Sequence, residues 1–316
     1  MITVRSLRVD YENVTAVCDL NLDITAGQIY GLVGPNGAGK TSTIKALAGI
    51  LEPTYGEIKI AGYDFDLNPQ EALRHVGFMP DFPPVYEHLK VWEYLDVFAA
   101  SYLIPPADRL KRSRHWIERV NLKEKWDAYI RDLSRGMRQR LILAKTLLHN
   151  PDVLLMDEPA SGLDPLARIE MREILKEIAT DGKTIIISSH ILTELSDFCN
   201  ATGIMEKGRM VVSGSLQDIR AHIGAKKEIF IRLLDGARVE NQSKQDFLKA
   251  LNEFSFVLNP GEIRPGEFSM FFSGEEKDAA GLLSELIKRN FPVLTFQLKE
   301  ADVEDIFFKV GAKEVS

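Results

Sequence analysis

Short apolar runs recur along the first two thirds of the chain, each bounded by glycine, proline or polar residues. The runs at 2–9, 28–33, 57–60, 76–80, 153–156 and 184–187 predict strands. The last two are apolar at almost every position, which is typical of strands covered on both faces of a sheet. The segments 42–48 and 135–148 repeat apolar residues at helical spacing instead. This alternation of strands and helices predicts an α/β fold.

The pattern changes twice along the chain. From about 82 to 150 it is helical, with breaks at Pro83-Pro84 and Pro105-Pro106 because proline disrupts a helix interior. Beyond about Gln217 the order becomes strand, helix, two strands, helix and strand, which suits a small ferredoxin-like α+β domain. The predicted elements of that tail are 228–234, 244–251, 254–258, 268–272, 279–288 and 293–298. We therefore expect domains at 1–216 and 217–316.

Residues 34–41 read Gly-Pro-Asn-Gly-Ala-Gly-Lys-Thr, between the predicted strand 28–33 and the predicted helix 42–48. The glycines let the backbone curl so that successive N–H groups surround a polyphosphate. Lys40 is then placed to reach the β- and γ-phosphates, and the Thr41 hydroxyl to ligate Mg²⁺. The positive end of the following helix faces the same phosphates. A glycine-rich turn without a ligand is the alternative, and the flanking strand and helix argue against it.

Two adjacent carboxylates, Asp157 and Glu158, follow the apolar run 153–156. Consecutive residues at a strand end point to opposite sides, so the two acids can take different tasks. We expect Asp157 to hold Mg²⁺ and Glu158 to orient and deprotonate an attacking water. A strand that merely ends in solvated acids is the alternative.

A third segment, Leu133-Ser134-Arg135-Gly136-Met137, begins the helical run 135–148. Ser134 is well placed as an N-cap, and a helix start of this kind can bind an anion. Gly136 would allow close approach of the backbone to a phosphate. Taken alone, a segment of this kind is more often an ordinary capped helix.

Together these three segments, in this order and spacing, resemble the ATP-binding cassette (ABC) family over roughly residues 2–215. Residues 133–137 resemble the family's signature loop, normally LSGGQ, and Ser161-Gly162-Leu163-Asp164 resembles its D-loop. His190, after Ser188-Ser189, resembles its switch histidine, and Tyr11 stands where the family places an aromatic residue that stacks on adenine. Without the resemblance, His190 would more often be a helix-capping or core histidine, and Tyr11 a plain strand aromatic.

The resemblance implies an ATPase core with a mixed sheet and a helical subdomain at about 82–150, followed by the α+β domain. The implied cofactors are ATP and Mg²⁺. Catalytic roles fall on Glu158, His190 and Asp81, and metal contacts on Thr41, Asp157 and Asp81. The implied nucleotide contacts are Tyr11, Gly34, Asn36, Gly37, Ala38, Gly39, Lys40, Thr41, Ser42, Ser134, Gly136 and Asp164.

Three positions depart from the common family pattern. Arg135 replaces a signature glycine, Met137 replaces the signature glutamine, and Asp81 stands where the Q-loop glutamine is expected. These changes resemble the pattern of drug-exporter-type cassettes. The shorter, charged Asp81 could hold a Mg²⁺-bound water, whereas the usual amide contacts cannot be carried over to it.

Composition narrows the choice of partners. The formal net charge of −7 argues against a general nucleic-acid surface, which needs a clustered basic face. The basic residues at 109–114 are better explained as the solvated side of a helix whose inner face carries Leu110, Ile117 and Val120. Two cysteines give no disulfide framework and fit a reducing cytosol. No apolar run is long enough to cross a bilayer, and Met1–Arg5 does not begin a signal peptide.

The sequence thus predicts the ATPase subunit of a membrane exporter, cytoplasmic and held on the inner face of the membrane by an integral-membrane permease. In the family, Ser134 faces the nucleotide of the opposite cassette, so we expect two copies to close around two Mg-ATP molecules. The helical subdomain would receive the permease. Five aromatic residues lie at its start: Phe82, Tyr86, Trp92, Tyr94 and Phe98. We expect most of these rings in the core and one or two in a groove for the partner.

The main alternative is an importer ATPase whose tail is a regulatory sensor. A ligand-binding tail would favour it, and the residues Arg135 and Met137 disfavour it. The last segment, Ala301–Phe308, resembles the closing helix of the C-terminal domains on exporter-type cassettes, and the tail as a whole is best explained as a packing or dimer-stabilising domain.

Overall fold

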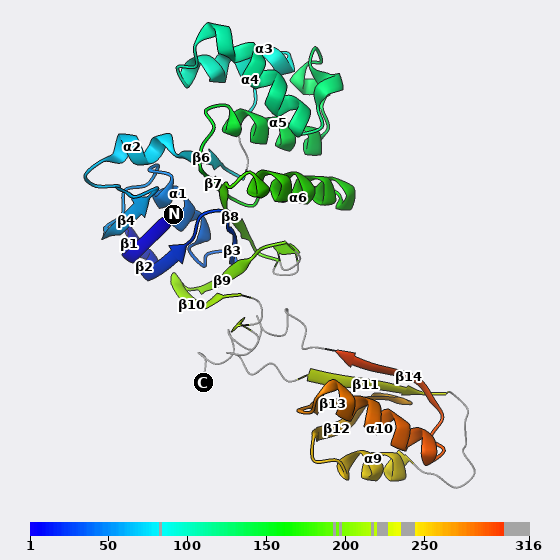
Figure 1. Ribbon diagram of the computed structural model, residues 1–316. Coiled ribbons are helices and arrows are strands. Elements are labelled where there is room, and N and C mark those ends of the chain that lie inside the picture. The colour runs from blue at the N-terminus through cyan, green and yellow to red at the C-terminus, as the bar shows by residue number, and fades with distance from the viewer. Residues whose placement is uncertain are drawn as a thin grey trace. The chain divides into compact units, whose positions relative to one another are not determined.

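The computed structural model describes residues 1–81, 84–191, 194–195, 198–215, 218–219, 227–234 and 244–299. The chain forms two compact units, Met1–Gln217 and Asp218–Ser316 (Figure 1). Phe82 and the segment Ala301–Phe308, both singled out in the sequence, lie outside the described residues.

The first unit is built on a six-stranded sheet of order β10-β9-β3-β8-β7-β6. Neighbours from β9 to β6 are parallel, and β10 is antiparallel to β9. The central strands β3 (Ile29–Val33), β7 (Val153–Met156) and β8 (Thr184–Ser189) are buried at every position. Parallel strands covered on both faces have this apolar character. The flanking strands are β6 (Val76–Met79), β9 (Ala201–Glu206) and β10 (Arg209–Gly214).

A second, antiparallel sheet of order β2-β1-β4-β5 belongs to the same unit. Its strands are β1 (Ile2–Tyr11), β2 (Val14–Ile24), β4 (Tyr55–Ile60) and β5 (Tyr63–Asp64). Their inward residues alternate with exposed ones and share one hydrophobic core with α1 (Lys40–Leu47) and with the strands β3 and β7. Two further helices are α2 (Pro69–Arg74) and α6 (Pro165–Thr180).

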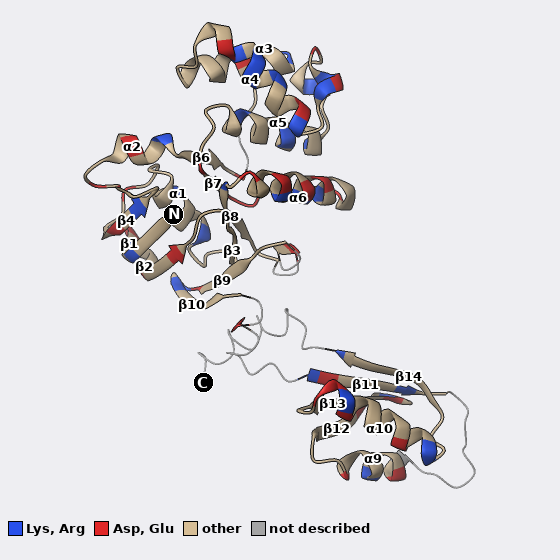
Figure 2. Cartoon of the chain, in the orientation of Figure 1, with Lys and Arg blue, Asp and Glu red and all other residues tan. Residues whose placement is uncertain are grey.

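Helices α3 (Val91–Ser101), α4 (Pro106–Arg119) and α5 (Arg135–Leu147) pack on one another and form the helical part of the unit (Figure 1). Short 3-10 turns lie at Lys123–Lys125 and Ile130–Asp132. Lys and Arg gather along α4, whereas both signs of charge mix along α6 (Figure 2). The buried side of α4 includes Trp116, Ile117 and, just after the helix, Val120. The prediction that Leu110 lies on that side was wrong, since Leu110 is 59% exposed. The buried residues of α4 begin only at Ser113, so the first turns of the helix do not pack against the core.

The second unit has a four-stranded antiparallel sheet of order β12-β13-β11-β14. Its elements follow as β11 (Lys227–Leu233), α9 (Lys244–Asn252), β12 (Val257–Arg264), β13 (Glu267–Phe272), α10 (Glu276–Lys288) and β14 (Val293–Lys299). A separate core built on Phe247, Phe268, Phe272 and Leu282 stabilises it.

The strand predicted at 254–258 was placed too early. Phe254 and Phe256 pack against the core from a turn, in which the Val257 N–H donates to the Phe254 carbonyl at 3.0 Å. Strand β12 then continues to Arg264 through polar residues and Pro260. Proline is tolerated there because β12 is an edge strand.

Candidate active site

The loop 34–41 joins β3 to α1 and curls as its glycines allow. Gly37 and Gly39 have φ of 82° and 100°, a region that side chains other than glycine rarely adopt. A Cβ on Gly39 would also collide with the Ala16 carbonyl oxygen, and one on Gly34 with the Met205 carbonyl oxygen. The loop is therefore packed tightly against β2 and β9.

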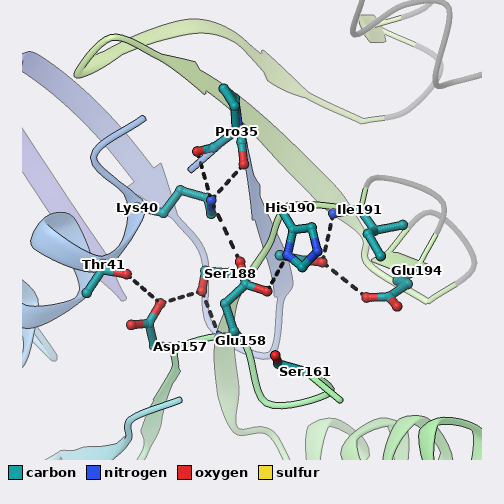
Figure 3. A network of polar contacts seen from close by, with 12 residues as sticks. Pro35, Lys40, Thr41, Asp157, Glu158, Ser161, Ser188, His190, Ile191 and Glu194 are labelled. Carbon is teal, nitrogen blue, oxygen red and sulfur yellow. Dashed lines mark hydrogen bonds and ion pairs between the residues drawn. The ribbon is translucent and has the colours of Figure 1, made fainter. Parts of the chain in front are cut away.

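The Lys40 ammonium lies inside this loop. Its Nζ donates to the Gly34 carbonyl at 2.6 Å and to the Pro35 carbonyl at 3.2 Å, and lies 3.7 Å from Glu158 Oε1 (Figure 3). The residue is only 5% exposed. Burial lowers the pKa of Lys40, and the nearby carboxylates of Glu158 and Asp157 oppose that shift. This arrangement keeps a cation at the centre of the loop.

Asp157 and Glu158 follow β7, at the edge of the sheet where the parallel strands β3 and β8 also end. Asp157 Oδ1 accepts hydrogen bonds from Thr41 Oγ1 at 3.1 Å and from Ser188 Oγ at 2.7 Å. Glu158 instead has its carboxylate between Lys40 and the His190 ring, whose Nδ1 lies 2.8 Å from Glu158 Oε2 (Figure 3). The two acids thus differ in their surroundings, as different tasks require.

The backbone of Glu158 is held in an unusual conformation. Its φ is +47°, a value uncommon outside glycine. The Glu158 N–H donates to Ser188 Oγ at 2.9 Å, and the Glu158 carbonyl accepts from the Ser161 N–H at 3.0 Å. Contacts on both sides of the residue therefore stabilise this conformation.

Asp81 faces the same site from the end of β6. Burial raises the pKa of Asp81, and the charges of Asp157 and Glu158 raise it further. Its Oδ1 is buried without a hydrogen-bond partner among the described residues. Buried polar atoms of this kind are normally satisfied, so this oxygen suits a ligand, a metal ion or a water.

These side chains border one open pocket of about 470 Å³. Of the predicted residues, it is lined by Tyr11, Asn36, Gly37, Ala38, Gly39, Lys40, Thr41, Ser42, Asp81, Asp157, Glu158 and His190. One end of the lining is formed by Tyr11, Val14 and Ala16. The Tyr11 ring is 48% exposed, with its hydroxyl 3.3 Å from Ser42 Oγ. An exposed ring beside a phosphate loop offers a stacking surface for a nucleobase.

Four predicted nucleotide contacts are not among the residues that line this pocket. Ser134 is the N-cap of α5, and its hydroxyl accepts from the Met137 N–H at 3.3 Å. Asp164 is the N-cap of α6 and accepts from the Ala167 N–H at 2.9 Å. A Cβ on Gly136 would approach the Ala167 Cβ to 2.9 Å, so this glycine lets α5 and α6 pack closely. Gly34 begins the loop, and its carbonyl accepts a hydrogen bond from Lys40.

Sequence reasoning did not assign a role to Ser188. Its side chain is fully buried and bridges the two acids, accepting from the Glu158 N–H and donating to Asp157. A serine at the end of an apolar strand is a weak signal, because only the pairing of β7 with β8 brings it to the acids. Ser161 was named as part of a loop and also lines the pocket.

The oxygen atoms at the acid end of the pocket suit Mg²⁺. Thr41, Asp157 and Asp81 supply hydroxyl and carboxylate oxygens, the donors that this hard cation prefers. Among the described residues no cluster of three or more His, Cys, Asp or Glu could hold a metal by itself. Mg²⁺ commonly binds through one or two carboxylates together with substrate phosphates, so the donor set fits that mode.

A buried strand, a glycine loop with a central lysine, a helix start and two acids at the end of a neighbouring parallel strand define a P-loop ATPase. A family model for ABC transporters matches residues 17–161. The chain is 32% identical, over its full length, to the Nod factor export ATP-binding protein I of Ralstonia nicotianae, of which it covers 95%. It is 28% identical to the linearmycin resistance ATP-binding protein LnrL of Bacillus subtilis, over 99% of both chains.

A solved structure of an ATP binding subunit of an ABC transporter superposes with a TM-score of 0.64 at 31% identity, covering 71% of this chain and 93% of that one. The chain belongs to the ABC transporter family, as an ATP-binding subunit. The α/β cassette fold, nucleotide binding and ATPase activity predicted from the sequence are thereby confirmed.

Proposed function

We propose that this chain hydrolyses ATP as the motor subunit of a membrane exporter, with Glu158 as the general base. The observation that carries the proposal is the convergence of Lys40, Thr41, Asp157, Glu158 and His190 on one pocket at the carboxyl edge of the parallel sheet. Catalysis of phosphoryl transfer depends mainly on positioning and on stabilising charge, and this set supplies both.

Each residue has a distinct role in the proposal. The loop N–H groups and Lys40 bind the β- and γ-phosphates, and Lys40 exchanges its contacts with the Gly34 and Pro35 carbonyls for them. Thr41, Asp157 and Asp81 hold Mg²⁺, which supplies charge neutralisation on the phosphates when bound. Glu158 accepts a proton from the attacking water, and His190 keeps the Glu158 carboxylate oriented.

The proposed working unit is a pair of these chains. Ser134, Gly136 and Asp164 lie outside the pocket of their own chain, at the starts of α5 and α6. Helix N-termini favour anions, so the start of α5 can meet the γ-phosphate bound by a second copy. ATP would hold two copies together, and loss of the γ-phosphate would release them.

The membrane connection is proposed to come from a separate permease. None of the helices among the described residues is long and apolar enough to cross a bilayer. Tyr94 is buried in the helical part, whereas Tyr86 and Trp92 are 58% and 37% exposed. These two exposed rings are candidates for the permease contact, since aromatic anchors are common in interfaces. The chain would then work at the cytoplasmic face of the membrane.

The export direction is supported by the names of two relatives, one described as an export protein and one as a resistance protein. The accessory unit Asp218–Ser316 is proposed to stabilise the pair or to pack against it. Reconstitution with the permease that co-purifies with the chain, followed by transport into or out of vesicles, distinguishes an exporter from an importer with a sensing tail.

Glu158→Gln tests the central assignment. The amide keeps the size of the side chain but cannot accept a proton, so ATP turnover should fall by roughly 10²- to 10⁴-fold. Mg-ATP binding should persist, because Lys40, Thr41 and Asp157 remain. The variant should therefore accumulate as an ATP-bound pair, which size-exclusion chromatography with ATP and Mg²⁺ detects. Glu57→Gln is a control for the loss of charge, since Glu57 lies in β4 away from the pocket lining. Near-normal turnover of Glu158→Gln would exclude this base.

A further inference from the structure

The start of α5 is tied to the loop that follows Glu158. Arg135 Nη2 donates to the Ser161 carbonyl at 2.9 Å. One turn further along α5, Gln139 is buried and its Nε2 donates to the Pro159 carbonyl at 3.2 Å. Two carbonyl groups of the loop 159–164 are thus held by side chains of one helix.

Gly162 makes room for the first of these contacts. Its φ is +64°, and a Cβ at this position would overlap the guanidinium of Arg135. The guanidinium therefore lies directly against the backbone of Gly162. The glycine serves two needs at once, because it provides both the left-handed turn and the space for the cation.

The loop transmits this contact to Glu158 through one turn of backbone. The Ser161 N–H donates to the Glu158 carbonyl at 3.0 Å, while the Ser161 carbonyl accepts from Arg135. Arg135, Ser161 and Glu158 consequently form a chain of hydrogen bonds. Its far end is Glu158, whose φ is +47° and whose carboxylate lies between Lys40 and His190. Strain of this kind persists only where the surroundings hold it in place.

We propose that Arg135 is a positioning residue for ATP hydrolysis, which holds Ser161 and thereby fixes the backbone of Glu158 within the same chain. The proposal rests on the role of Glu158 as general base. It gives a function to the residue at which the sequence departs from the signature glycine. It also links the start of α5, which is proposed to meet the nucleotide of a second copy, to the base that acts on the chain's own nucleotide.

Steady-state ATPase kinetics of the full-length chain test this link. Arg135→Ala should lower kcat roughly tenfold, the effect of losing a hydrogen bond from a charged donor. The Kd for a fluorescent ATP analogue and the KM should stay within about twofold. Arg135→Lys still reaches a carbonyl but cannot cover Gly162, so it should recover part of the lost rate. Lys176→Ala, which removes the same charge from an exposed position of α6, should leave kcat unchanged.

A double-mutant cycle with Gly162 separates a contact within the chain from a contact to the partner's nucleotide. Gly162→Ala should lower kcat in the wild-type background, where its methyl group displaces the guanidinium. The positive φ of Gly162 strains an alanine in both backgrounds, but in the Arg135→Ala background the clash with the guanidinium is absent, so the same methyl group should have a clearly smaller effect. Additive effects, or a raised KM with unchanged kcat in Arg135→Ala, would overturn the proposal in favour of direct nucleotide contact.

ATP turnover of Glu158→Gln, measured in parallel, distinguishes the proposed role of Arg135 from the proposed role of Glu158 as general base. If Glu158→Gln loses turnover and Arg135→Ala does not, only the positioning role fails. If Glu158→Gln retains turnover, the assignment of the base fails first. Should Arg135→Ala not fold, as judged by its thermal unfolding, Arg135→Lys and Gly162→Ala carry the same comparison, and unchanged kcat in both refutes the link.

Discussion

Replacing Ser188 by alanine removes a single buried hydroxyl that both acids use. Its oxygen accepts from the Glu158 N–H at 2.9 Å, and its proton is donated to Asp157 Oδ1 at 2.7 Å. Ser188 is fully buried, so water does not replace the hydroxyl readily. The Glu158 N–H is then left without its partner next to a backbone that already has a positive φ.

The size of the effect follows from these two hydrogen bonds. A buried donor left unpaired costs about 1–3 kcal/mol, and a hydrogen bond to a charged acceptor contributes about 1.5–3 kcal/mol. We expect the free energy of unfolding to fall by roughly 2–4 kcal/mol, since the two terms overlap in one residue. If displacement of Glu158 raises the activation free energy of hydrolysis by about 1.4 kcal/mol, kcat falls about tenfold.

Urea unfolding and steady-state ATPase assays measure the two effects separately. Thr184→Val is the matched control, because Thr184 lies on the same strand and is also fully buried. Its hydroxyl accepts from the Gly27 N–H at 3.1 Å, at the end of β8 away from the acids. The control should lose stability but keep kcat within about twofold. Equal kcat values in Ser188→Ala and Thr184→Val would refute the idea that Ser188 positions Glu158.

Three other predictions concern separate parts of the chain. Lys40→Ala should abolish tight Mg-ATP binding, because it removes the cation inside the loop; a fluorescent-analogue titration with unchanged affinity would exclude the loop as the site. Burial lowers the pKa of His149, whose ring packs at a tilt against Tyr102 with 4.3 Å between the ring centroids. As the pH is lowered, the unfolded chain takes up the His149 proton before the folded chain does. The contribution of His149 to the free energy of unfolding should therefore be complete above about pH 6.5 and fall below it. Urea titrations at several pH values should show a smaller dependence of the free energy of unfolding on pH in His149→Gln. Phe247→Ala should cost the accessory unit about 3–5 kcal/mol and leave nucleotide binding intact, which calorimetry and the same titration check; loss of binding would contradict the separation of the two cores.

The sequence was most informative where the residues of a functional motif are consecutive in the chain. Residues 34–41 and the pair Asp157 and Glu158 could be assigned because each motif follows a short apolar strand directly. Because the carboxyl ends of parallel strands share one edge of a sheet, the two motifs were expected to lie close together. The structure places Lys40 3.7 Å from Glu158 and Thr41 3.1 Å from Asp157.

Features that depend on distant partners were not predictable in the same way. Ser188 reaches the acids only through the pairing of β7 with β8. Gly136 also leaves room for Ala167 of α6, a packing role that no local pattern reveals. Strand β12 carries polar residues and Pro260, so its hydrophobic pattern is weak, and only its position at the edge of the sheet explains it.

The part of the pocket lined by Tyr11, Val14 and Ala16 has a consequence for how the site recognises a nucleobase. Its side chains, Tyr11, Val14 and Ala16, offer a ring face and apolar surface, and the Tyr11 hydroxyl is turned to Ser42. Stacking accepts any nucleobase, because every base has a π-face. The Tyr11 ring can therefore hold the base of ATP in place without itself selecting adenine, and most of the binding free energy is expected from the phosphate contacts of the loop 34–41.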